Sequence, residues 1–218
     1  MARETASARR ARALRIVRLL AKAYPDAACA LHYRGAFELL VATILSARCT
    51  DKKVNEVTPA VFARFPTPTA MAQADPAELE RLIQPTGFYR QKAQSILSAS
   101  QDLVGRFDGS VPGTLEALVT LRGVGRKTAN VVLGNAFGVP GLTVDTHMTR
   151  VNRRLALTQH EDPEKIELDL MELVPRKEWT IYSHRVIQHG RVCCDARRPR
   201  CEQCPLRAEC PWPEQHGS

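Results

Sequence analysis

The hydrophobic positions of this chain repeat at helical spacing along most of its length. One segment places five apolar residues at i, i+3, i+4, i+7 and i+8: Phe37, Leu40, Val41, Ile44 and Leu45. The same spacing recurs over 89–107 and in a segment that starts at Asp162 and Pro163. No run alternates apolar and polar residues as a half-buried strand requires. The pattern therefore predicts an all-α protein with short connections.

Glycine and proline divide this pattern into separate helices. Thr114 is suited to cap a short helix that ends near Leu121, and a further helix is predicted over 126–137. The last long helix is predicted over 181–189. Pro59 falls inside an otherwise helical stretch, so we expect it to kink or split that helix.

The first 22 residues are rich in arginine and carry one acid, Glu4. Such a start is typical of an organelle transit peptide, but Leu14, Val17 and Leu20 also supply the apolar face of a helix that belongs to the fold. We favour the second interpretation, because no processing site follows. No secretory segment is present, so we expect a cytoplasmic protein, associated with the nucleoid if it is bacterial.

Composition and charge narrow the class of partner. The chain has 218 residues, of which 44% are hydrophobic, enough for the core of one large or two small domains. No apolar run reaches the length of about 18 residues that a membrane span needs. The net charge of +8 favours a polyanionic partner, with nucleic acid first and a membrane surface second.

Five of the seven cysteines lie close to the carboxyl end. Four of them have metal-ligand spacing, with gaps of six, two and five residues: Cys194, Cys201, Cys204 and Cys210. Thiolates are the usual ligands of iron–sulfur clusters and of structural zinc. Zinc sites usually show two close pairs, whereas only Cys201 and Cys204 form one here, so the spacing favours iron–sulfur and leaves zinc open. Cys193 adjoins Cys194 and is left out of the ligand set.

A glycine-rich turn lies between two predicted helices. Gly123 and Gly125 permit a tight hairpin and let the backbone N–H groups of the following helix approach an anion. Lys127 follows in the first turn of that helix. It could be an amine nucleophile or one more phosphate contact, and the residues alone favour the phosphate contact.

Two polar residues follow a Gly/Pro loop further along the chain. Asp145 stands where a helix cap belongs, although its carboxylate could instead face a reaction centre and stabilise a developing cation. The spacing does not decide between these roles. His147 is more often a structural residue than a catalyst in such a position.

Three segments of the chain together resemble the endonuclease III family of DNA glycosylases. They contain the GVGRKTA hairpin, the VDTH sequence and the cysteine pattern, and they cover residues 39–55, 121–151 and 189–210. The resemblance implies an all-α fold of two helical domains that flank a DNA-binding cleft. A six-helix barrel domain would occupy 28–139, with a helix-hairpin-helix at about 115–134. A discontinuous [4Fe–4S] cluster domain would combine 1–27 with 140–218.

The resemblance also implies a reaction. Lys127 matches the family's nucleophilic lysine and Asp145 matches its essential aspartate. The protein would be a bifunctional DNA glycosylase and abasic-site lyase of base excision repair, which removes oxidised pyrimidines from duplex DNA through a Lys127 Schiff base and cuts the strand by β-elimination. The four cysteines would hold the [4Fe–4S] cluster. Duplex DNA is the expected partner, with no membrane and with a monomeric chain.

The same resemblance assigns residues to DNA contact and to the substrate pocket. The predicted DNA contacts are Arg48, Phe88, Gly123, Val124, Gly125, Arg126, Thr128 and Arg198. The predicted pocket residues are Asp51 and His147. This chain departs from the family at three places, with Arg48 where a glutamine is common, Phe88 where a leucine wedge is common, and Arg122 where a proline is usual. These departures affect which lesions and opposite bases the protein is expected to accept.

Two other classes of function stay open at this point. A non-catalytic or redox-responsive DNA-binding module would use the same hairpin and cluster but would not cleave DNA. A zinc-stapled nucleic-acid-binding protein would give a colourless preparation, whereas an iron–sulfur protein is yellow-brown. Lys127 discriminates the enzyme from the first alternative, and we favour the enzyme.

Overall fold

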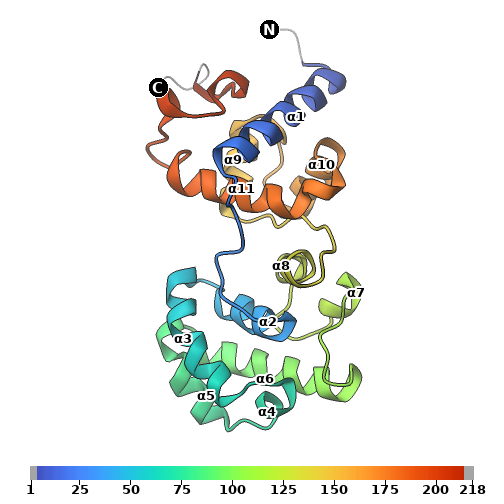
Figure 1. Cartoon of the computed structure of the whole chain (residues 1–218), viewed down its shortest axis with the longest axis vertical. Coiled ribbons are helices and arrows are strands. Elements are labelled where there is room, and N and C mark those ends of the chain that lie inside the picture. Colours follow the sequence, from blue (N-terminus) through green and yellow to red (C-terminus); the bar gives the residue numbers. More distant parts are fainter. Residues whose placement is uncertain (1–3, 214–218) are drawn as a thin grey trace. The chain divides into compact units, whose positions relative to one another are not determined.

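The computed structural model describes residues 4–213 (Figure 1). Within this range the chain forms α-helices and short 3₁₀-helices without a β-strand, which confirms the predicted all-α class. No helix in the range is both long and apolar enough to cross a membrane. The chain separates into two compact units, which we call the hairpin unit (residues 29–139) and the terminal unit (residues 4–28 and 140–213).

The hairpin unit is built around a helix that is buried on nearly all sides. Every residue of α2 from Glu38 to Leu45 is buried, because α3, α6 and α8 all pack against this helix. The longest helix of the unit, α6, also packs against α4 and α5 (Figure 1). The helices of the unit are α2 (Ala36–Leu45), α3 (Asp51–Arg64), α4 (Pro68–Ala72), α5 (Pro76–Ile83), η1 (Gln84–Thr86), α6 (Tyr89–Arg106), α7 (Leu115–Leu118) and α8 (Arg126–Ala136).

The terminal unit joins the first helix of the chain to its last third. Its helices are α1 (Ala6–Ala23), α9 (Thr146–Arg154), α10 (Pro163–Leu173), η2 (Arg176–Glu178), α11 (Trp179–Val192), η3 (Cys201–Gln203) and η4 (Arg207–Glu209). Ala13, Ile16, Val17 and Leu20 of α1 are buried in the core of the unit, so the Arg-rich start forms a helix of the fold, as we expected.

Arginines on the other side of α1 attach it to distant segments. Arg12 donates hydrogen bonds to the backbone carbonyls of Leu155 and Glu209, at 2.6 and 3.1 Å. Arg15 pairs with the carboxylate of Glu209 at 2.7 Å. Part of the positive charge at the start of the chain therefore stabilises the folded structure.

The helix boundaries follow local sequence signals closely. The side chain of Thr114 accepts a backbone N–H group and caps α7, as predicted. The predicted start at Asp162 and Pro163 is confirmed, since α10 begins at Pro163 and the side chain of Asp162 caps it. The last long helix extends beyond the predicted 181–189, since α11 runs from Trp179 to Val192. Of the two outcomes expected at Pro59, the split is wrong, because α3 continues through it from Asp51 to Arg64, and the kink stays a prediction.

Burial explains why the helix continues through this proline. Val54, Val57, Val61 and Phe62 form the buried stripe of α3 on both sides of Pro59. Burying several large apolar side chains stabilises the helix by more than the about 3 kcal/mol that an interior proline costs. Tertiary packing therefore overrides the local signal.

Candidate functional site

The glycine turn forms a tight hairpin between α7 and α8 in the hairpin unit. Gly123 has a φ of +80°, and a Cβ atom at this position would lie 2.7 Å from the Cβ atom of Ser95. Both the backbone conformation and the close approach to α6 therefore require glycine. Val124 is buried beneath the turn and anchors it in the core.

Gly125 has a different role from Gly123. It caps α8 with a φ of −88°, and a Cβ atom built on it would meet nothing within 4 Å. No side chain caps this helix, and the first N–H groups of a helix have no partner within it. The start of α8 therefore offers open space to an anion such as a phosphate.

Lys127 lies in the first turn of α8 and its side chain is exposed. Arg126 and Thr128, on either side of it, are half-buried. Gly123, Gly125, Arg126 and Thr128 thus lie on the surface of the hairpin, whereas the side chain of Val124, also predicted as a contact, is buried beneath it. An exposed amine therefore lies beside a helix start that is open to an anion.

Two predicted DNA contacts that are 40 positions apart in the sequence lie together in the structure. The guanidinium of Arg48, in the loop between α2 and α3, lies over the ring of Phe88 at 5.4 Å from its centroid. Phe88 is 58% exposed, and both residues adopt left-handed backbone conformations, with φ of 52° and 48°. The stacked pair therefore protrudes from the hairpin unit. Asp51 begins α3 just after the Arg48 loop and is half-buried.

In the terminal unit, Asp145 caps α9. Its Oδ1 accepts the backbone N–H of Met148 at 2.8 Å, so the capping role that the sequence suggested is confirmed. The side chain is half-buried, and its other carboxylate oxygen makes no hydrogen bond within the described part of the chain. Capping by one oxygen therefore leaves the second able to interact with a substrate.

His147 lies in the first turn of the same helix and is held by its neighbours. The guanidinium of Arg150 lies 3.0 Å from its Nδ1 and donates to the carbonyl of Gly190 at 2.9 Å. Burial lowers the pKa of His147, against the effect of Asp145, which raises it. The imidazole is therefore kept neutral more readily than an exposed histidine.

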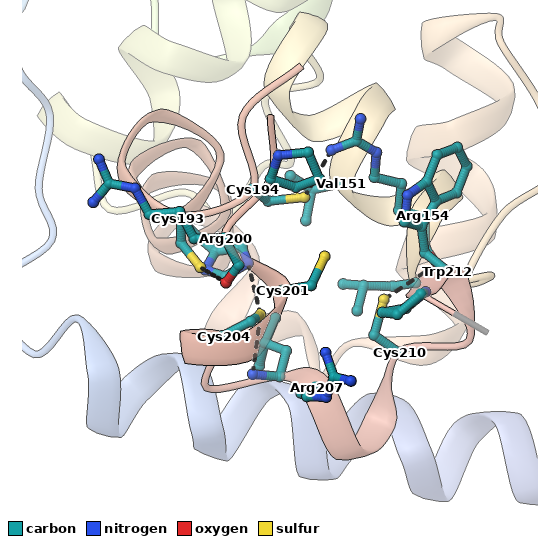
Figure 2. Close-up of a pocket in the computed structure, with 15 residues that line it drawn as sticks. Val151, Arg154, Cys193, Cys194, Arg200, Cys201, Cys204, Arg207, Cys210 and Trp212 are labelled. Carbon is teal, nitrogen blue, oxygen red and sulfur yellow. Dashed lines mark hydrogen bonds between the residues drawn. The ribbon is translucent and has the colours of Figure 1, made fainter. Parts of the chain in front are cut away.

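The four predicted metal ligands line one cavity of the terminal unit. Figure 2 shows the sulfur atoms of Cys194, Cys201, Cys204 and Cys210 around this space. Cys194 follows α11, and the other three lie on the turns formed by η3 and η4. Fifteen residues line the cavity, Arg154, His189 and Trp212 among them.

The thiols of this cavity receive hydrogen bonds that suit thiolate ligands. Arg154 donates to the Sγ of Cys194 at 3.3 Å, and the backbone N–H of Leu206 donates to the Sγ of Cys204 at 3.4 Å. Burial raises the pKa of Cys204 to about 12 and that of Cys210 to about 11. Without a metal these groups are neutral thiols, and a metal that binds them must displace their protons.

A second grouping of donors overlaps this set. The donor atoms of His189, Cys193 and Cys204 all lie within 4.8 Å of one another. Within the described residues, no three of the four predicted cysteine ligands have sulfur atoms that all lie within 4.8 Å of one another. A tetrahedral zinc with Zn–S bonds of about 2.3 Å holds its sulfurs about 3.8 Å apart. The wider spacing of the four cysteines therefore suits a cluster of several metal atoms better than a single zinc ion.

Arginines surround the cysteine segment on its exposed side. Arg197, Arg198 and Arg200 are exposed, and the carboxylate of Asp195 accepts the backbone N–H groups of Arg197 and Arg198 at 2.9 and 3.1 Å. These hydrogen bonds lower the pKa of Asp195 and fix the loop that carries the arginines. The loop presents a fixed group of positive charges to solvent.

Comparison with known proteins identifies the family of this chain. Residues 41–176 match the HhH-GPD superfamily of base excision DNA repair proteins. Endonuclease III of a Synechocystis species is 51% identical over 94% of each chain, and endonuclease III of Bacillus subtilis is 43% identical over 86% of each chain. This chain belongs to the endonuclease III family.

Solved structures of endonuclease III have the same fold as this family member. A non-covalent endonuclease III–DNA complex is 42% identical, with a TM-score of 0.90 over 94% of this chain and 97% of the other. A trapped endonuclease III–DNA covalent intermediate is 41% identical, with a TM-score of 0.91 over 96% and 99%. The family assignment makes the chain a DNA glycosylase and lyase of base excision repair, which confirms the predicted enzyme class.

Sequence reasoning missed two residues that shape the sites of this endonuclease III relative. Lys92 is buried below the Arg48 and Phe88 loops. His189 lies between Tyr24 Oη, 2.8 Å from its Nδ1, and Cys204 Sγ, 3.7 Å from its Nε2. His189 could have been found from the sequence, because it lies four residues before Cys193. Nothing in the local sequence distinguishes Lys92 from a solvated helix residue.

Proposed function

We propose that this endonuclease III relative removes oxidised pyrimidines from duplex DNA and cleaves the resulting abasic site through a Schiff base on Lys127. The observation that carries the proposal is an exposed lysine in the first turn of α8, directly after a glycine hairpin open to an anion. The hairpin N–H groups bind the phosphate of the target strand, and the lysine then faces the sugar beside it.

The chemistry follows from an amine at that position. The Lys127 amine attacks C1′ of the flipped nucleotide, the glycosidic bond breaks, and the base leaves with a proton. Opening of the sugar and loss of the amine proton give an imine, which makes the C2′ proton acidic. Removal of that proton expels the 3′ phosphate. Asp145 stabilises positive charge at the sugar and exchanges a proton with the lysine, and its oxygen not used for capping supports this role.

The remaining predicted contacts complete the proposed DNA interface. Arg126 and Thr128 extend the phosphate site of the hairpin, and Arg198 adds a phosphate contact from the cysteine segment. Arg48 and Phe88 enter the duplex at the lesion, which their stacking and exposure support. Asp51 and His147 are each proposed to contact the flipped base.

We propose that Cys194, Cys201, Cys204 and Cys210 hold a [4Fe–4S] cluster. Their common cavity, their all-thiol donor set and the spacing of their sulfurs support it. The cluster would cross-link the end of α11 to η3 and η4 and so fix the arginine-bearing loop. Cys193 stays outside the ligand set, and its Sγ donates to the carbonyl of Arg200 at 3.8 Å.

The two units support the proposed domain division. The hairpin unit would be the six-helix barrel domain with the helix-hairpin-helix, and its start at residue 29 lies one residue from the proposed 28. The terminal unit would be the cluster domain. We propose that the chain acts as a monomer on nucleoid DNA in the cytoplasm.

Borohydride trapping on a duplex with one thymine glycol tests the proposal. We expect a covalent protein–DNA adduct with the wild-type chain and with Lys165→Ala, whose side chain is also exposed but lies on α10. Lys127→Ala should give no adduct while it still binds the duplex. An adduct on an abasic duplex alone would reject the pyrimidine specificity, and no adduct on either DNA would favour a non-catalytic binding module.

A further inference from the structure

A buried lysine connects the two loops that carry Arg48 and Phe88. Lys92 lies near the start of α6 and is 5% exposed. Its Nζ donates two hydrogen bonds of 2.8 Å, one to the carbonyl of Leu45 and one to the carbonyl of Thr86. Leu45 is the last residue of α2, and Thr86 is the last residue of η1. One ammonium therefore holds both loops where they begin.

The chain needs such a restraint at this place. Arg48 and Phe88 both have positive φ, a conformation that residues with a side chain rarely adopt. Conformations of this kind persist only where the surroundings impose them. Lys92 contributes on the Phe88 side through its backbone as well, because its N–H donates to the carbonyl of Phe88 at 3.1 Å.

The chemistry of the site explains why an ammonium is used there. The last carbonyls of a helix have no partner within it and carry the negative end of the helix dipole, and Leu45 is one of them. An ammonium offers three donors to such acceptors. Burial lowers the pKa of Lys92, so the position is costly for a charge that only stabilises packing. Its low exposure also rules out a direct contact with a DNA phosphate.

We infer that Lys92 is a positioning residue that locks the Arg48 and Phe88 loops into a single duplex-engaging unit. The inference rests on the proposed function, in which this stacked pair enters the duplex at the lesion. Lys92 acts through the pair, because it touches the backbone beneath each loop and is shielded from solvent.

A binding experiment tests this without the lyase reaction. Dissociation constants are measured for a duplex with a tetrahydrofuran abasic analogue and for the same duplex undamaged, and their ratio gives the discrimination. Lys92→Met should lower the discrimination about tenfold, since restraining two left-handed residues is worth at least that factor. Binding to undamaged duplex should stay the same. An unchanged discrimination would overturn the inference.

A double-mutant cycle separates positioning from general stability. Phe88→Ala alone should also lower the discrimination, and the double variant with Lys92→Met should lose no more than Phe88→Ala does. Multiplying losses would overturn the inference. Leu103→Ala, in the last turns of α6 and fully buried, is the control that lowers stability but keeps the discrimination.

Two further measurements keep the result interpretable. Where Lys92→Met does not fold, Lys92→Gln takes its place; its side chain is one bond shorter and uncharged, so it should hold the two carbonyls less well and the discrimination should again fall. Borohydride trapping of the wild-type chain on an abasic duplex is run in parallel. Its failure would reject the Lys127 mechanism, whereas failure of the cycle would reject the role of Lys92 alone.

Discussion

Replacing Gly123 by alanine should destabilise the hairpin unit strongly. The new Cβ atom would lie 2.7 Å from the Cβ and 2.9 Å from the Oγ of Ser95, and the backbone φ of +80° is unfavourable for alanine. The backbone strain costs about 1–2 kcal/mol and the overpacking about 1–3 kcal/mol. We therefore expect Gly123→Ala to lower the free energy of unfolding by about 2–5 kcal/mol in urea titrations.

The neighbouring glycine supplies a matched control. Gly125→Ala meets no atom within 4 Å and keeps a negative φ, so it should lose only about 1 kcal/mol, the cost of a poorer helix N-cap. It should weaken DNA binding instead, because the methyl group enters the space offered to a phosphate. Gly123→Ala with wild-type stability would refute the packing argument.

A double-mutant cycle with Ser95 tests the origin of the destabilisation. Ser95→Gly removes the atoms that the new Cβ would meet, so the combined variant should recover the overpacking part of the loss, about 1–3 kcal/mol. The strain from the positive φ should remain. Purely additive effects would show that the clash with α6 is not the cause.

Three further predictions concern the terminal unit. Cys201→Ala should abolish the yellow-brown colour and the bound iron, whereas Cys193→Ala should keep both, as iron analysis and visible absorption can show. Asp145→Asn keeps an amide oxygen for the cap, so its thermal unfolding should match that of the wild type while lyase activity is lost. A loss of stability in place of a loss of lyase activity would show that Asp145 has only a structural role. Burial lowers the pKa of His184 below 6.5, so the unfolded chain takes up the proton at a higher pH than the folded chain. The free energy of unfolding should therefore fall as the pH drops below about 6.5. His184→Asn should weaken that dependence in urea titrations at stepped pH.

Local signals in the sequence were sufficient for much of the fold. Thr114 can be recognised as a cap because its side chain bonds to a backbone group only three residues away. The stripe of α2 was found because its spacing is helical. A split at Pro59 does not occur, since the local rule gives the cost of the missing N–H but not the burial of Val57 and Val61 beside it.

The site residues divide in the same way. The hairpin from Gly123 to Lys127 and the cysteine segment are contiguous in sequence, so a motif can reveal them. The stacking of Arg48 on Phe88 and the bonds of Lys92 to Leu45 join positions about 40 or more residues apart. Such contacts depend on how α2 and α6 pack, and no periodicity within either segment encodes them.

The central claim is that the amine of Lys127 forms the covalent bond to the abasic sugar. Peptide mapping by mass spectrometry of the borohydride-trapped adduct tests it most directly. We expect the DNA remnant on the peptide that contains Lys127, in the first turn of α8. A remnant on any other lysine or on the terminal amine, with Lys127 unmodified, would contradict the mechanism.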